Sequence, residues 1–113
     1  MPETYKVVGT NIGTTAATNI YLGVTSVTGG YALVNSINVA NGSTGLANIF
    51  SVELLKGGST AFFVINNATL PTGASIQILD NTLVLERNDN LRCTAGYTFG
   101  VHVLVSSLEI TWQ

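Results

Sequence analysis

Apolar and polar residues alternate over short distances along this chain, and glycine, asparagine and threonine interrupt the alternation repeatedly. Leu33, Ile37 and Val39 fall on one face of an extended segment, where Asn35 is a polar mismatch that indicates a bulge or a strand end. Windows with a helical period of 3.6 residues are nearly absent, because glycine or β-branched residues interrupt them. The pattern therefore predicts an all-β chain.

Eight or nine strands are expected from this pattern, mostly antiparallel because the connections are short. They are predicted at 1–8, 18–24, 31–41, 46–56, 60–65, 75–79, 83–85, 91–94 and 99–112. That number of strands around one small core favours a single-domain antiparallel β-sandwich that is jelly-roll-like. The sandwich is expected over 18–113. The segment 1–17 is interpreted as an amino-terminal arm or loop, because 9–17 is polar, rich in small residues and without alternation.

Three local features make sharper predictions. The five residues 41–45 contain an Asn-Gly pair between two alternating runs, which predicts a hairpin joining 31–41 to 46–56. The run 60–65 is apolar on both faces and is expected to be a central strand, with Phe50, Phe62 and Phe63 in the core. The change of phase at Ser106-Ser107 is interpreted as a bulge in the last strand.

Composition restricts the function. Charged residues make up only 9% of the 113 residues, with a net charge of −2, and four Lys and Arg cannot neutralise a run of phosphates. No apolar run approaches the ~20 residues of a membrane helix. The first residues lack a secretory signal, so synthesis in a cytoplasm is expected. We therefore expect neither nucleic acid nor membrane as a partner, whereas a surface with few charges favours association with neighbouring proteins.

Chemistry-bearing residues are few. His102 is the single histidine and alternates with Val101 and Val103, so it is expected to point outward, and Cys93 is expected to be a small buried apolar residue. One histidine and one cysteine do not make a zinc site. No nucleotide-binding or serine-hydrolase motif is present. The chain is predicted not to be an enzyme, with no cofactor and no metal.

Two groups of acidic residues leave alternatives open. Asp80, Glu86 and Asp89 offer oxygen ligands for calcium, but their spacing matches no EF-hand loop, and Asx residues commonly build turns, which is the preferred interpretation. Glu53 and Glu109 would make a carboxylate pair for glycoside cleavage only if the fold brought them together.

Aromatic rings near segment ends are candidates for an assembly interface, because an amphipathic ring suits a surface that is partly wet. Tyr21, Tyr31, Tyr97 and Trp112 lie beside polar residues at such ends, and Trp112 is the preferred single anchor. Together with apolar residues of the amino-terminal segment, the predicted interface set is Tyr5, Val7, Val8, Ile12, Tyr21, Tyr97 and Trp112.

Five segments of the sequence together resemble a group of small all-β virion structural proteins of tailed bacteriophages. These segments are 34–41, 50–54, 68–75, 83–92 and 101–110. The resemblance covers 31–111 and includes the turn Leu70-Pro71-Thr72-Gly73. In that group a Gly-Asp usually precedes the strand equivalent to 91–94, and here Asn88-Asp89 stands in its place. The departure is mild, since asparagine also tolerates the left-handed conformation.

The resemblance implies a virion component assembled in the host cytoplasm. The expected role is a capsid decoration (cement) protein on the capsid surface, a homotrimer that bridges subunits of the major capsid protein or neighbouring virion proteins. The alternative is a tail, fibre or receptor-contacting glycan-binding module of the virion.

Overall fold

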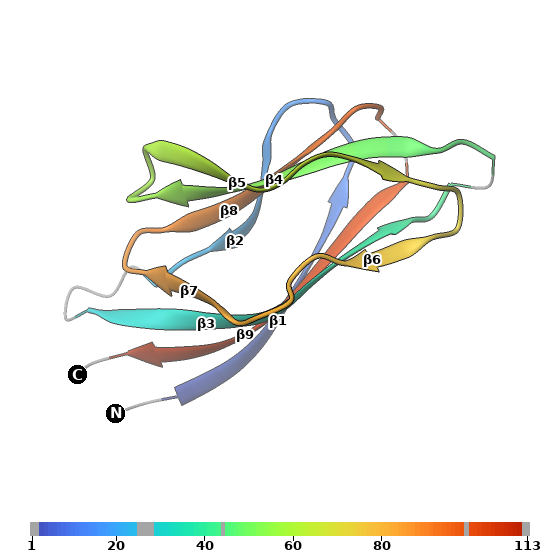
Figure 1. Ribbon diagram of the computed structural model, residues 1–113. Coiled ribbons are helices and arrows are strands. Elements are labelled where there is room, and N and C mark those ends of the chain that lie inside the picture. Colours follow the sequence, from blue (N-terminus) through green and yellow to red (C-terminus); the bar gives the residue numbers. More distant parts are fainter. Residues whose placement is uncertain (1–2, 25–28, 44, 99, 112–113) are drawn as a thin grey trace.

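Nine strands form two antiparallel sheets that face each other in the computed structural model, which describes residues 3–24, 29–43, 45–98 and 100–111 (Figure 1). The strands are β1 (Glu3–Ile12), β2 (Thr18–Leu22), β3 (Gly30–Asn41), β4 (Asn48–Lys56), β5 (Thr60–Leu70), β6 (Ser75–Gln77), β7 (Leu83–Glu86), β8 (Asn90–Ala95) and β9 (Val101–Thr111). The five-stranded sheet has the order β1-β9-β3-β6 with β7 also on β3, and the four-stranded sheet has the order β2-β8-β4-β5. The expected all-β sandwich is confirmed.

The strand pairs are nested along the chain. β4 pairs with β5, β3 with β6 and β7, β2 with β8, and β1 with β9, so each pair encloses the one before it. The chain is thus one long antiparallel hairpin, rolled up so that β9 also meets β3 and β8 also meets β4. This is the arrangement of a jelly roll.

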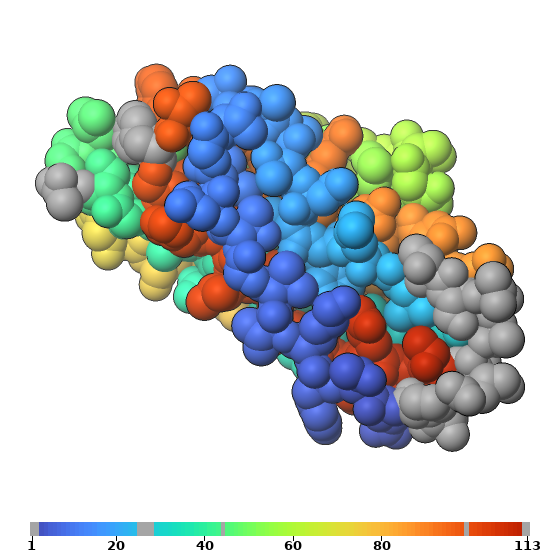
Figure 2. All heavy atoms as spheres, turned by 180° about the vertical axis from the view of Figure 1, so that it is seen from behind, coloured from blue at the N-terminus to red at the C-terminus, as the bar shows by residue number. Residues whose placement is uncertain are grey.

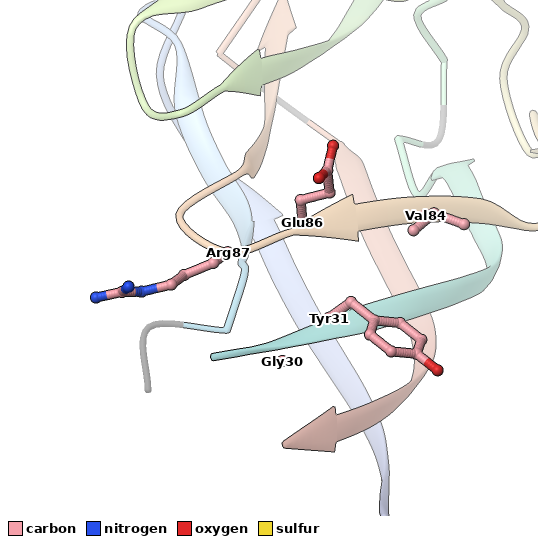
Figure 3. Close-up of a pocket in the computed structure, with 5 residues that line it drawn as sticks. All are labelled: Gly30, Tyr31, Val84, Glu86 and Arg87. Atoms are coloured by element: carbon pink, nitrogen blue, oxygen red, sulfur yellow. The ribbon is translucent and has the colours of Figure 1, made fainter. Parts of the chain in front are cut away.

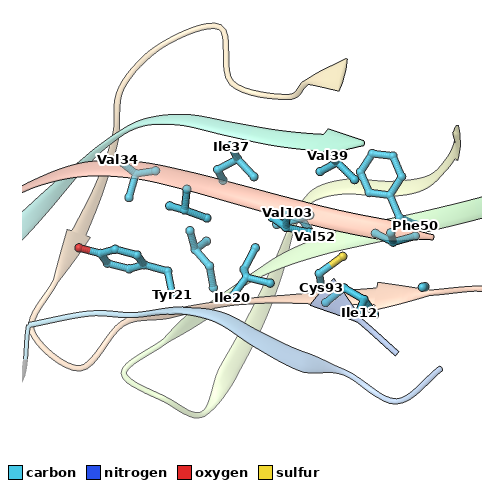
Figure 4. Packing of buried hydrophobic residues seen from close by; sticks show 14 of the residues in the cluster. Ile12, Ile20, Tyr21, Val34, Ile37, Val39, Phe50, Val52, Cys93 and Val103 are labelled. Carbon is cyan, nitrogen blue, oxygen red and sulfur yellow. The ribbon is translucent and has the colours of Figure 1, made fainter. Parts of the chain in front are cut away.

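The core lies between the sheets because strand side chains alternate between two faces. Val34, Ile37, Val39 and Val103 of the five-stranded sheet pack against residues of the other sheet, and all are at most 1% exposed (Figure 4). From the opposite sheet come Ile20, Phe50, Val52 and Cys93. Removing large side chains such as Phe50 from such a core costs about 3–5 kcal/mol.

One of two predicted irregularities is present. The register between β3 and β9 shifts between Val34 and Ser36, so Asn35 is the bulged residue expected from its mismatch. The bulge predicted at Ser106-Ser107 of the last strand is wrong, because β9 alternates without interruption there and the extra residue, Asn35, belongs to the facing part of β3. Asn88 adopts a φ of 68°, the left-handed conformation that asparagine tolerates.

The predicted hairpin around 41–45 is wrong. Both strands form, but β3 and β4 belong to different sheets, and the connection carries the chain across the sandwich. Asn41, which is buried, organises this crossing: its side-chain amide donates to the carbonyls of Leu46 and Leu70. A short loop favours local pairing, but here the nested long-range partners, β6 and β7 for β3, take its place.

The expectations for 60–65 are also wrong. This run belongs to β5, an edge strand of the four-stranded sheet, and Phe62 and Phe63 are 57% and 59% exposed. Of the three phenylalanines placed in the core, only Phe50 lies there. A run that is apolar on both faces indicates full burial only if both faces are covered, and here Val64 and Ile65 pack against the core while Phe62 and Phe63 stay exposed.

The arm expected over 1–17 is corrected for its first part. β1 pairs with β9 without a break from Glu3↔Ile110 to Ile12↔Val101, so 3–12 is an integral edge strand (Figure 2). The following residues 13–17 form an exposed connection to β2. The small polar residues did not prevent strand formation, because side chains of β1 alternate between the two faces of the sheet. Val8, Thr10 and Ile12 face the core, and the residues between them face outward.

Candidate interaction surface

A row of four apolar side chains crosses the outer side of the five-stranded sheet. Tyr5 is the register partner of Leu108, Leu108 of Leu33, and Leu33 of Val84, one from each of β1, β9, β3 and β7. Their chain neighbours Ala32, Val34, Leu85 and Ser107 are buried between the sheets, so the row faces away from the core. Cross-strand partners lie about 5 Å apart at Cβ, which makes the row continuous.

Two more apolar residues widen the row. Val7 follows Tyr5 on the same side of β1, and Leu104 lies on the same side of β9, beside Gly9. We call these six residues the outer apolar face; they are Tyr5, Val7, Leu33, Val84, Leu104 and Leu108. Tyr5 is 81% exposed and Val84 51%, while Leu33 and Leu108 are partly covered by their neighbours. A contiguous apolar patch on a polar-neutral protein is typical of an interaction surface.

A hollow of about 510 Å³ lies at the Val84 end of the outer apolar face, lined by Gly30, Tyr31, Val84, Glu86 and Arg87 (Figure 3). Arg87 extends from the turn after β7 and is exposed. Lys6, Lys56 and Arg92 each form an ion pair, whereas Arg87 forms none with any described residue. The hollow therefore combines Tyr31 and Val84 with one acidic and one basic residue, Glu86 and Arg87.

The free edge of β1 carries a lysine that disfavours pairing with another strand. No described strand pairs with its outer side, but Lys6 points inward near the middle of the strand, opposite Ser107. Its ammonium lies 3.5 Å from the Glu109 carboxylate and 5.5 Å from the centroid of the Tyr21 ring. An inward-pointing lysine on an edge strand disfavours pairing with another strand.

The edge of β5 is interrupted in another way. Its register with β4 shifts twice, around Val52, and Asn67 adopts a φ of 51°. Such bulges bend an edge and remove the flat template for strand addition. Both long free edges are thus unsuited to pairing, which leaves the sheet faces as the available surfaces.

Beneath the β1 edge, Tyr21 of the four-stranded sheet reaches the other sheet. Its hydroxyl is hydrogen-bonded to Ser107 at 2.7 Å and donates to the Glu109 carboxylate. Burial, and after it the hydrogen bond to Glu109, raises the pKa of Tyr21 well above its ordinary value. The phenol therefore stays protonated and links the two sheets as a fixed donor.

Asp89 joins three segments at one end of the sandwich. Its buried carboxylate accepts hydrogen bonds from the Lys56 ammonium at 2.8 Å and from the backbone N–H groups of Gly57 and Glu86 at 2.8 and 2.9 Å. Burial alone would raise its pKa, but these hydrogen bonds outweigh burial and the pKa of Asp89 is lowered. Its carbonyl also accepts from Gly23, where an added Cβ would lie 2.1 Å from that oxygen.

The structure divides the predicted interface set. Tyr5 and Val7 belong to the outer apolar face, and Val8 faces inward and is partly buried. Ile12 and Tyr21, at 1% and 2% exposed, lie in the chain's own core, so their assignment to an interface is wrong. Tyr97 is half-exposed after β8, where its backbone bonds with the Asn48 side chain, and Trp112 lies outside the described residues.

Four members of the outer apolar face were not identified from the sequence: Leu33, Val84, Leu104 and Leu108. The outward position of Leu104 could have been predicted from the sequence, because Leu104 alternates with the buried valines 101, 103 and 105. It lies on the same side of β9 as His102, which is exposed as expected. Leu33 had been placed with Ile37 and Val39, and the bulge at Asn35 reverses that assignment.

The candidates for chemistry lie apart. Glu53 is paired with Arg92 in the four-stranded sheet, and Glu109 is bonded to Tyr21 from the other sheet, so each carboxylate already has a partner. Asp89 builds the predicted turn. No group of three or more His, Cys, Asp or Glu among the described residues is placed to hold a metal ion. Cys93 is buried, and burial raises its pKa to about 12.

Helices that are long and apolar enough to cross a membrane are not found in the described part of the chain. No family model matches the sequence, and no curated protein matches it either. Among solved structures, a chain from the structure of infectious bursal disease virus, Gt strain, aligns over 98% of this chain with a TM-score of 0.43 and 14% identity. The present chain spans 31% of that chain.

Proposed function

We propose that this protein is a structural component of a tailed-bacteriophage virion, a capsid decoration protein located on the capsid surface that stabilises the head by bridging capsid subunits. The observation that carries the proposal is the outer apolar face, an uncharged row across four strands whose ends, Tyr5 and Val84, are exposed in the described chain. Jelly rolls are common in viral shells, but fold alone does not assign a role, so the surface bears the argument.

The proposed mechanism is burial of apolar area across the seams of the shell. Each Å² of apolar surface removed from water contributes roughly 25 cal/mol, so even one seated tyrosine adds a useful share of affinity. A protein that contacts several subunits at once gains further through effective concentration. Because β1 is an integral strand guarded by Lys6, the bridge uses the sheet face and not a free arm.

The low charge of the chain suits this role. With a net charge of −2, copies of the protein repel each other weakly when many crowd on one particle. The resemblance over 31–111 is the reason for naming a tailed phage and not viruses in general.

Quantitative mass spectrometry of purified virions tests the proposal. Hundreds of copies per particle are expected for a decoration protein. A handful of copies would move the protein to the tail or fibre, and a glycan-array signal lost in Tyr97→Ala would then support the glycan-binding alternative. Absence from purified particles would contradict the virion role altogether.

Variant proteins test the surface. Particles lacking the protein are incubated with wild-type chain, with Tyr5→Ser/Val84→Ser, and with the control Phe63→Ser. Phe63 is an exposed aromatic residue on the edge strand of the other sheet, so it matches Tyr5 in kind. The double variant is expected to lose occupancy while the control keeps it, and equal occupancy of both would contradict the assigned surface.

A further inference from the structure

We infer that the Asn41-Gly42 pair is a deamidation site, protected in the folded chain and reactive in the unfolded chain, so that its modification makes unfolding irreversible. It is the only Asn-Gly pair in the sequence. The pair does not form the hairpin that its sequence predicts, because β3 and β4 belong to different sheets. This property belongs to the fold itself and does not depend on the proposed function.

Deamidation joins the two residues through a cyclic imide. The Gly42 nitrogen loses its proton to solvent and attacks Cγ of Asn41, and the side-chain amide leaves as ammonia with a proton from solvent. Water then opens the imide: breaking the bond to Cγ gives aspartate, and breaking the bond to the backbone carbonyl carbon gives isoaspartate, in which the chain continues through the side chain. Glycine favours this attack because it has no side chain and restricts the backbone least.

The leaving amide of Asn41 is held by buried hydrogen bonds. Its nitrogen donates to the carbonyls of Leu46 and Leu70 at 2.9 and 3.0 Å. Its oxygen accepts a hydrogen bond from the backbone N–H of Ser43 at 2.9 Å. Asn41 is 3% exposed, so its amide cannot leave as ammonia without breaking hydrogen bonds in a place where water does not replace them.

The attacking nitrogen and the backbone around it are held as well. Gly42 donates its N–H to the carbonyl of Gly100 at 2.6 Å, and this is the proton that the reaction must remove. The N–H of Asn41 donates to Ala74 at 2.9 Å, and its carbonyl accepts from Gly73 at 3.2 Å. Ring closure requires the backbone and the side chain of Asn41 to rotate toward each other, which these bonds oppose. The reaction therefore proceeds through the unfolded chain.

Neither product fits the place that Asn41 occupies. In aspartate, an oxygen replaces the nitrogen that donates to Leu46 and Leu70, so a buried carboxylate would face two carbonyl oxygens. In isoaspartate, the additional backbone atom would also disturb the pairing of Asn41 with Val101 at the end of β3. A chain that is modified while unfolded therefore does not return to this fold.

Incubation of the full chain at alkaline pH, with and without concentrated urea, tests the protection. Gly57→Asn supplies a control pair before Gly58 in the same molecules. Position 57 is exposed, its φ of 62° is one that asparagine tolerates, and an added Cβ there meets nothing within 4 Å. Circular dichroism shows that the control variant is folded, and peptide mass spectrometry measures deamidation at both sites.

The two sites should respond differently to folding. At position 41 the folded chain should react at least about 100-fold more slowly than the chain in urea, because only the small unfolded fraction reacts. At position 57 the two rates should agree within about tenfold, because an exposed loop tip opens easily. Equal protection of both sites, a rate at 41 that folding does not slow, or no deamidation at 41 in urea would each overturn the inference.

Removal of the urea tests the consequence. Size-exclusion chromatography separates chains that regain the native fold, and their peptides are compared with those of the whole sample. Chains modified at 57 are expected in the native fraction, whereas chains modified at 41 are expected to be excluded from it. Native chains that carry the modification at 41 in the same proportion as the whole sample would overturn the irreversibility. None of these results changes the copy number or occupancy expected on particles, so the proposed function is tested separately.

Discussion

The outer sides of the two sheets differ in the charge of the side chains that form a cross-strand row. On the five-stranded sheet, one residue from each of four neighbouring strands forms the row Tyr5, Leu108, Leu33 and Val84. On the four-stranded sheet, the corresponding construction gives Asn19, Arg92, Glu53 and Phe63. The central pair there is an ion pair, with the Arg92 Nε 3.2 Å from Glu53. The row on the four-stranded sheet is therefore centred on two charges, whereas the row on the five-stranded sheet carries none.

The two sheets also use charge differently. Lys56 and Arg92 both belong to the four-stranded sheet, and Asp89 fixes its β4–β5 end to the turn before β8. The five-stranded sheet places Lys6 and Glu109 on its inner side, near Tyr21, and the outer side of its strands carries no Lys or Arg in the described ranges. Charge therefore stabilises the structure of one sheet, whereas its scarcity on the other leaves a surface for association.

The largest expected effect comes from removing Asp89. Asp89→Ala leaves the buried N–H groups of Gly57 and Glu86 without their acceptor and should lower the free energy of unfolding by about 3 kcal/mol. Urea denaturation measures the change. Asp80→Ala, an exposed carboxylate in the loop before β7, is the control and should shift it by less than about 0.5 kcal/mol. Equal losses in the two variants would contradict the role given to Asp89.

Low pH should destabilise the end of the sandwich that Asp89 holds together. Because the folded-state pKa of Asp89 is lowered, its contribution is complete above the ordinary pKa of about 3.9 and is lost as the pH falls through the lower folded value. Hydrogen exchange near and below pH 4 should therefore show β4 and β5 opening before β3 and β9. Uniform opening of both sheets would remove the distinction between them.

Making the central pair of the four-stranded sheet's outer row apolar should change stability less than Asp89→Ala does. Glu53→Leu with Arg92→Leu removes a partly exposed ion pair and should change the free energy of unfolding by less than about 1 kcal/mol. The variant would carry a second apolar row, so light scattering should show new, concentration-dependent association. An unchanged association state would mean that an uncharged row is not enough to create an interface.

Tyr5→Ser is expected to have the smallest effect on folding. Its side chain is 81% exposed, so the free energy of unfolding should stay within about 0.5 kcal/mol of wild type, as measured by urea denaturation under dilute, monomeric conditions. A large loss there would show that Tyr5 packs within its own chain and would weaken its assignment to an assembly surface.

The sequence was sufficient for the fold class and for one of two predicted irregularities. Alternation located the strands, and the polar mismatch at Asn35 correctly marked a bulge. Pairing could not be read in the same way, because the partners of β3 lie far along the chain, whereas the short loop after it favours a hairpin. The alternation within one segment predicts that the segment is a strand. The nested pairing of a jelly roll depends on the whole chain and cannot be predicted from one segment.

The interaction surface was predicted only in part. Tyr5 and Val7 were identified as apolar residues of the first segment, but Ile12 and Tyr21 share that character and point inward. Which side of a strand meets the core depends on its register with neighbours, so the inner and outer sets cannot be separated before pairing is known. The row itself exists only across four strands, and no single segment displays it.

The central claim is that the outer side of the five-stranded sheet is covered in the assembled particle while that of the four-stranded sheet stays in solvent. Radical footprinting of purified virions and of dilute free chain, read at Tyr5 and at Phe63 by mass spectrometry, measures this directly. We predict strong protection of Tyr5 in the particle and unchanged labelling of Phe63. Equal labelling of Tyr5 in both states, or protection of Phe63 alone, would contradict it.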